Sequence, residues 1–217
     1  SWMEDKKHPG RYDFSSKMRA VKALRQAGVR GYGMVDTEKY TPAWLSRKAG
    51  PKEDPVADPA KYYAEAENFF RTLVETFRDD IEEWAVSCEI NIVAPGKPYM
   101  YQRHLDLVRL FSRVAKAVNP KIRVLSMSVS GGDGRDVPRF RFTREMMPKI
   151  ADCLDGFAPD QYTEAPCYGE GYNPVNSDRW FRRRFRRYVP AIRALVAPLA
   201  EERILVAKEA VAYYEAL

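Results

Sequence analysis

Residues 84–96 read WAVSCEINIVAPG, an apolar β-like run that leads directly into a carboxylate. The pattern predicts a buried strand over 84–90, in which Trp84 and Val86 come shortly before Glu89. Burying a carboxylate without a partner is costly. Glu89 therefore needs a partner, an open cleft or a chemical role, and the rest of the chain decides between these.

Helical and strand-like patterns alternate on both sides of this stretch. Further strands are predicted at 29–35, 122–129, 154–162 and 203–210. Helices are predicted at 15–27, 60–78, 101–118 and 143–153, and over the arginine-rich stretch 179–193. Such alternation requires parallel strands with helices packed outside them. It predicts an α/β fold, either a doubly wound sheet or a (β/α)₈ barrel.

The composition is that of one soluble globular domain, residues 1–217. The chain is 45% hydrophobic and 30% charged. No run of about 18 apolar residues indicates a membrane span. Its three cysteines are not spaced like zinc ligands, and it has only two histidines. The glycine-rich stretch SGGDGRD, 130–136, lacks the spacing of a dinucleotide fingerprint. We therefore expect neither a metal nor another cofactor.

The net charge of +6 comes largely from one stretch, RWFRRRFRRYVPAIR, residues 179–193. Phe181, Phe185, Val189 and Ile192 follow helical steps, with the arginines mainly on the other face. The pattern favours a solvated amphipathic helix. A basic face can bind phosphate, so a polyanion-binding or nucleic-acid-binding protein remains a third hypothesis. No recognised nucleic-acid motif supports it, and we expect no nucleic-acid partner.

Two glutamates, Glu89 and Glu209, lie in or directly after strand patterns. In a parallel barrel the active site forms where the strands end, so both side chains can be aimed at one point. Glycosidic bond cleavage needs two such carboxylates, one protonated and one ionised. The alternative is that each glutamate forms a salt bridge at the rim of the barrel, for example with Lys208.

Several stretches resemble the clan A glycoside hydrolases, retaining (β/α)₈ enzymes with catalytic glutamates on their fourth and seventh strands. The similar segments are HPGRYDFSSKMRAVKALRQAGVRGYGMV (8–35), TPAWLS (41–46), DPAKYYAEAENFFRTLVETFRDDIEEWAVSCEIN (58–91), NPKIRVL (119–125), LDGFAPDQY (154–162) and RILVAKEA (203–210). The resemblance covers nearly the whole chain. It implies a partial (β/α)₈ TIM barrel of about strands three to seven. Strands one, two and eight are absent, as expected if the chain is part of a longer protein.

The resemblance also implies roles for individual residues. Glu89 takes the place of the acid/base and Glu209 that of the nucleophile, which Tyr162 orients. Cys88 stands where the family has the asparagine that contacts the sugar 2-hydroxyl, and Asn91 matches an asparagine of the same motif.

Other side chains are candidates for substrate contact. Trp44 is a candidate platform for stacking on a sugar ring. Asp36, Asp160 and Glu164 are candidate ligands for sugar hydroxyls, and Asp160 stands where the family often has histidine.

The leading hypothesis is a retaining β-glycoside hydrolase that cleaves O-glycosidic bonds in a poly- or oligosaccharide by double displacement. We therefore expect a carbohydrate substrate as the partner and no membrane partner. The second hypothesis is a non-catalytic carbohydrate-binding barrel that has lost hydrolysis. Cys88 is the reason for this alternative, because the asparagine contact that it replaces strengthens in the transition state.

Overall fold

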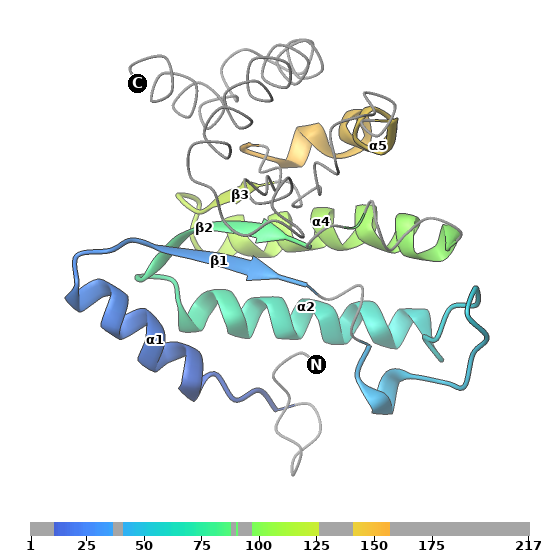
Figure 1. Cartoon of the computed structure of the whole chain (residues 1–217), viewed down its shortest axis with the longest axis horizontal. Helices are drawn as coiled ribbons and strands as arrows, with labels where there is room; N and C mark the ends of the chain where they lie inside the picture. The colour runs from blue at the N-terminus through green and yellow to red at the C-terminus, as the bar shows by residue number, and fades with distance from the viewer. Residues whose placement is uncertain (1–10, 37–40, 88–89, 91–96, 126–140, 157–217) are drawn as a thin grey trace, which may run out of the picture.

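The computed structural model describes residues 11–36, 41–87, 90, 97–125 and 141–156 (Figure 1). The elements in chain order are α1 (Ser15–Gln26), β1 (Gly31–Val35), the short 3₁₀ helix η1 (Ala43–Leu45), α2 (Pro59–Thr76), β2 (Ile81–Val86), α4 (Pro98–Val118), β3 (Arg123–Leu125), α5 (Arg141–Ile150) and the 3₁₀ helix η3 (Ala151–Cys153). None of these helices is long and apolar enough to cross a membrane.

The three strands form a parallel sheet in the order β1-β2-β3. A parallel bridge from Leu125 to Gly156 continues the same order beyond β3. Each strand thus lies beside its neighbour in the chain, and a helix makes each crossover, α2 between β1 and β2 and α4 between β2 and β3 (Figure 1). This sequential parallel order is compatible with part of a (β/α)₈ barrel.

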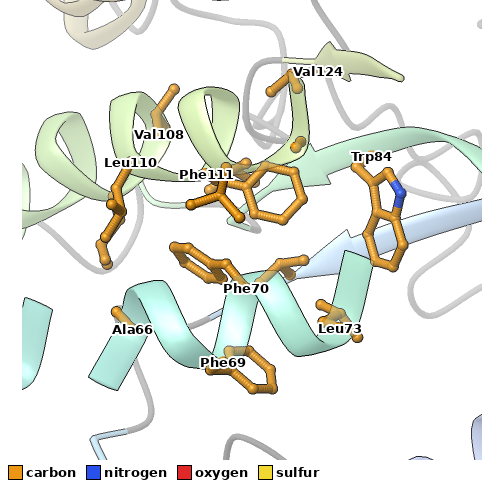
Figure 2. Close-up of a cluster of buried hydrophobic side chains, with 14 of the residues drawn as sticks. Ala66, Phe69, Phe70, Leu73, Trp84, Val108, Leu110, Phe111 and Val124 are labelled. Atoms are coloured by element: carbon orange, nitrogen blue, oxygen red, sulfur yellow. The ribbon is translucent and has the colours of Figure 1, made fainter. Parts of the chain in front are cut away.

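The core lies between the sheet and the two long helices. The ring of Phe70 on α2 meets that of Phe111 on α4 at 5.1 Å, and Trp84 on β2 lies 5.9 Å from Phe111 (Figure 2). The Trp84 ring also explains a glycine in β1. A Cβ added at Gly33 would lie 2.2 Å from Trp84 Cε3, so a larger residue does not fit there.

The opposite face of the sheet is more open. Tyr32 and Met34 of β1 alternate with the buried residues of that strand and are about half exposed. Glu83 and Arg123, which pair in register with Tyr32 across the sheet, form an ion pair of 2.6 Å. In a closed barrel this face points inward.

Most predicted elements before residue 126 are confirmed to within a few residues. The helix predicted at 60–78 is α2, whose start is fixed by Asp58, a side-chain cap on the Lys61 N–H at 3.1 Å, and by Pro59 in the first turn. The helix predicted at 15–27 is α1. Its apolar side is not buried, since Met18 is 50% and Leu24 41% exposed.

The strand predicted at 84–90 was placed too late. β2 runs over Ile81–Val86 and ends before Glu89. The prediction missed the start because Glu82 and Glu83 interrupt the apolar pattern. In the structure Glu82 is exposed and Glu83 pairs with Arg123, so both charges are accommodated in the strand.

The predicted helix at 143–153 corresponds to α5 and η3 together. Of the strand predicted at 122–129, β3 covers Arg123–Leu125, and the rest lies outside the described residues. Of the strand predicted at 154–162, the structure gives the bridge at Gly156. The predicted helix at 179–193 and strand at 203–210 also lie outside the described residues.

Candidate active site

The carboxyl ends of β1 and β2 lie side by side and form the base of the candidate site. Val35 pairs with Val86, and the Ser87 N–H donates to the Val35 carbonyl at 2.5 Å. Asp36 directly follows β1 at this edge and is partly buried. Glu89 comes three residues after the end of β2 in the sequence and itself lies outside the described residues.

Most of the residues predicted for the site stay predictions. The structure does not describe Cys88, Glu89, Asn91, Asp160, Tyr162, Glu164 or Glu209. It does describe Trp44, together with the segment that joins β1 to α2. That segment lies beyond the carboxyl end of β1 (Figure 1).

Trp44 is partly buried at the start of this segment, in η1. Its ring packs against the edge of the core, and the Lys61 ammonium lies over the ring at 5.4 Å from the centroid. The indole Nε1 is buried and has no hydrogen-bond partner in the part of the chain that the structure describes. Stacking of Trp44 on a sugar remains a prediction, and such a sugar would have to share the ring with Lys61.

The segment that carries Trp44 folds back on itself. Ser46 and Val56 form an antiparallel bridge, the Arg47 N–H donates to the Pro55 carbonyl at 2.7 Å, and the Ala57 N–H donates to the Leu45 carbonyl at 3.0 Å. These bonds fix residues 45–57 as a hairpin-like loop, so its shape is set before any ligand arrives.

A buried arginine fastens this loop to α4. Arg103 is 3% exposed, and its guanidinium donates to the carboxylate of Asp54, a loop residue. The same guanidinium lies over the rings of Tyr62 and Tyr99, at 4.9 and 5.2 Å from their centroids. The loop, α2 and the first turn of α4 therefore meet at one charged side chain.

We expect Asp54→Ala to lower the free energy of unfolding by on the order of 3 kcal/mol, because it leaves the buried Arg103 without its carboxylate. Arg103→Met should cost less, because the Asp54 side chain is 34% exposed and water can solvate it. Urea unfolding followed by circular dichroism measures both.

Asp79→Ala is the matched control for this pair of variants. The Asp79 side chain is 82% exposed and lies 4.0 Å from Arg78, so its loss should change the stability by less than about 0.5 kcal/mol. If Asp54→Ala changes the free energy of unfolding as little as this control, the buried Arg103 does not need the Asp54 carboxylate for stability.

A second polar contact joins α2 and α4 nearby. The Tyr63 hydroxyl donates to Asp106 at 2.9 Å, and Gln102 donates to the other oxygen of the same carboxylate at 2.9 Å. Burial and this hydrogen bond raise the pKa of Tyr63 well above its usual range. Tyr63 is therefore a neutral donor at physiological pH and holds the helices rather than acting as a base.

Sequence reasoning missed the Arg103–Asp54 contact, although one signal was present. Arg103 lies four residues before Leu107 and so falls in phase with the apolar stripe of α4. A charged residue in such a stripe needs a buried partner. That partner is 49 residues away in the chain, and helical periodicity does not identify it.

An open pocket of about 430 Å³ lies at the opposite, amino-terminal edge of the sheet. Its lining includes Arg25, Arg30, Tyr32, Asp80 and Glu82. Arg25 and Asp80 pair with each other at 2.8 Å. This pocket lies away from the edge that Asp36 and Ser87 occupy. In the described ranges, no group of three or more His, Cys, Asp or Glu side chains is arranged to hold a metal ion.

Comparisons with known proteins place the fold among glycoside hydrolases. The chain is similar to a psychrophilic glycoside hydrolase family 10 endo-β-1,4-xylanase, with a TM-score of 0.61 and 14% identity over 90% of this chain and 59% of the xylanase. It is also similar to a glucosidase from Croceicoccus marinus, with a TM-score of 0.61 and 16% identity over 94% of this chain and 39% of the glucosidase.

A third similar structure is a GH10 xylanase from termite gut that contains a bacterial Ig-like domain, with a TM-score of 0.55 and 13% identity over 85% of this chain and 43% of the xylanase. These neighbours are TIM-barrel glycoside hydrolases, and the chain spans less than two thirds of the length of each. No protein-family model and no curated protein matches the sequence. At this identity the likeness concerns the fold alone, an α/β fold with a parallel sheet that is compatible with part of a (β/α)₈ barrel.

Proposed function

We propose that the protein is a retaining β-glycoside hydrolase that cleaves O-glycosidic bonds in an oligo- or polysaccharide. One observation carries the proposal. Glu89 follows the carboxyl end of β2 in a sequential parallel sheet, and the fold is one that glycoside hydrolases share. In folds of this kind the chemistry takes place where strands end.

The proposed reaction uses two carboxylates in two steps. A carboxylate oxygen of Glu209 attacks the anomeric carbon while Glu89 gives its proton to the departing glycosidic oxygen. The bond between that carbon and that oxygen breaks, and a glycosyl ester forms on Glu209. Glu89 then takes a proton from water, and the water oxygen displaces Glu209. Two inversions retain the configuration and return both groups to their starting states.

Other residues bind and orient the substrate in this proposal. Tyr162 donates a hydrogen bond to Glu209, and Trp44 stacks on a sugar ring. Asn91 donates hydrogen bonds to sugar hydroxyls or accepts them, and the carboxylates of Asp160 and Glu164 accept them. Cys88 faces the sugar 2-hydroxyl with a thiol, which is a weaker donor than an amide.

Product stereochemistry tests the proposal. The full-length protein is screened against a panel of aryl β-glycosides and β-linked polysaccharides, and ¹H NMR follows the first-formed sugar. We expect the β-anomer to appear first and then mutarotate. An α-anomer, or no turnover on any substrate, contradicts the proposal. Glycan binding without turnover points instead to a non-catalytic carbohydrate-binding protein, the outcome that Cys88 favours.

A further inference from the structure

The residue that ends β2 has an unusual backbone. Ser87 has φ of 73°, and it is the one non-glycine residue with positive φ in the part of the chain that the structure describes. The left-handed region costs an L-residue about 1–2 kcal/mol, unless glycine takes the position. Residues held there often serve a functional site, because the surrounding structure must impose the conformation.

A hydrogen bond from the Ser87 N–H orients the peptide plane before this residue and leaves rotation about its N–Cα bond, which is φ, free. The packing around the buried side chain is therefore what holds this conformation. The Ser87 N–H donates to the Val35 carbonyl at 2.5 Å, one residue beyond the last pair of the ladder, Val35 with Val86. The Ser87 side chain is 0% exposed, and within the described residues its Oγ has no hydrogen-bond partner. The hydroxyl therefore does not stabilise the turn through a hydrogen bond, although serine often does so in turns.

A left-handed residue after an extended strand turns the chain sharply. In a continuing strand, alternation alone would decide which way each side chain points. At Ser87 the extended geometry ends, so alternation along β2 no longer predicts the direction of a side chain beyond it. Glu89 is the second residue after Ser87.

We propose that Ser87 is a positioning residue, whose left-handed backbone sets the direction in which the chain delivers Glu89 for proton transfer. This inference rests on the proposed function, in which Glu89 is the acid/base. Serine with a fully buried side chain has few backbone conformations open to it. Glycine at the same position reaches the left-handed conformation at no steric cost but also reaches many others.

The test is Ser87→Gly, measured with two aryl glycosides that differ in their leaving groups. A phenyl leaving group needs a proton from Glu89, whereas a 2,4-dinitrophenyl group leaves without one. We expect kcat/KM for the phenyl glycoside to fall about tenfold to a hundredfold, which is the loss of rate that a misplacement of about 1 Å causes. We expect less than about a twofold change for the dinitrophenyl glycoside, and a thermal midpoint no lower than that of the wild type.

Three further measurements separate positioning from a general structural effect. In a Glu89→Ala background, Ser87→Gly should add no loss, because it acts through the side chain already removed. Ser87→Ala removes only the hydroxyl and keeps the Cβ. It should therefore lower kcat/KM for the phenyl glycoside less than Ser87→Gly does. Ser15→Gly, a matched change at the exposed start of α1, should leave kcat/KM for both substrates unchanged.

The outcomes separate the role of Ser87 from the proposed function. Equal loss on both substrates, no loss on either, or the same loss from Ser87→Ala overturns the role of Ser87 while the proposed function stands. If the wild type turns over no glycoside of the full panel, the proposed function is wrong, and the role of Ser87 with it.

Discussion

Replacing Glu209 by alanine is expected to reduce turnover of an aryl β-glycoside by at least about 10⁴-fold, because the loss of a catalytic nucleophile leaves the first step without its attacking group. Binding of the substrate should change far less, since the same sugar contacts remain. The effect is therefore expected in kcat rather than in KM. Steady-state kinetics with a 2,4-dinitrophenyl glycoside measures both constants.

Azide should restore part of the activity of Glu209→Ala. The small anion fits the space that the carboxylate leaves and attacks the anomeric carbon from the same side, so the product is a glycosyl azide of inverted α-configuration. Glu82→Ala is the matched control, because Glu82 is an exposed glutamate of β2 and its loss should leave turnover unchanged. Undiminished turnover in Glu209→Ala removes Glu209 from the nucleophile role.

Replacing Glu89 by alanine should separate substrates by leaving group. For a phenyl glycoside we expect kcat/KM to fall about 10²- to 10⁴-fold, the usual contribution of a general acid. For a 2,4-dinitrophenyl glycoside the first step should hardly change, because this group leaves without a proton.

The second step of the Glu89→Ala variant should then be slow, because no base activates water, and the glycosyl ester should accumulate as a burst. Added azide should speed this step and give a β-glycosyl azide. Stopped-flow absorbance at the dinitrophenolate band follows the burst. If kcat/KM falls equally for the phenyl and the dinitrophenyl glycoside, Glu89 has a structural role and is not the acid/base.

The order of elements from α1 to β3 is predictable from the sequence because its apolar periodicities are long. The ladder Tyr62, Ala66, Phe69 and Leu73 repeats at helical spacing, and all four side chains are buried in α2. Local pattern was enough here, since each helix needs one continuous apolar face whatever lies against it.

The edges of the strands are less predictable, because they depend on partners far away in the chain. Glu83 looks like a residue outside a strand, yet Arg123, 40 residues later, makes it acceptable inside β2. The φ of Ser87 has no signal in the sequence at all. Serine rarely adopts it, and the full burial of this serine at the end of β2 is visible only in the structure.

The residues in and around the candidate site also differ in whether the sequence alone indicates them. Glu89 and Glu209 are predicted from the sequence, because a carboxylate after an apolar strand is an exception that needs a reason, and they stay predictions. The contact of Arg103 with Asp54 is found only from the structure, because it joins a helix to a loop with no repeating pattern. Asp54 lies in the loop 45–57, which directly follows Trp44, so the contact holds the segment next to this candidate residue.

Covalent trapping tests the central claim most directly, since a retaining hydrolase passes through an ester on its nucleophile. The full-length protein is incubated with the dinitrophenyl 2-deoxy-2-fluoro-β-glycoside of its preferred sugar, which forms the ester but hydrolyses it slowly. Intact mass and peptide mapping follow. We predict one added fluoroglycosyl group per chain, on the peptide that carries Glu209. A label on another residue, or an unlabelled chain that still turns over the parent glycoside, contradicts the account.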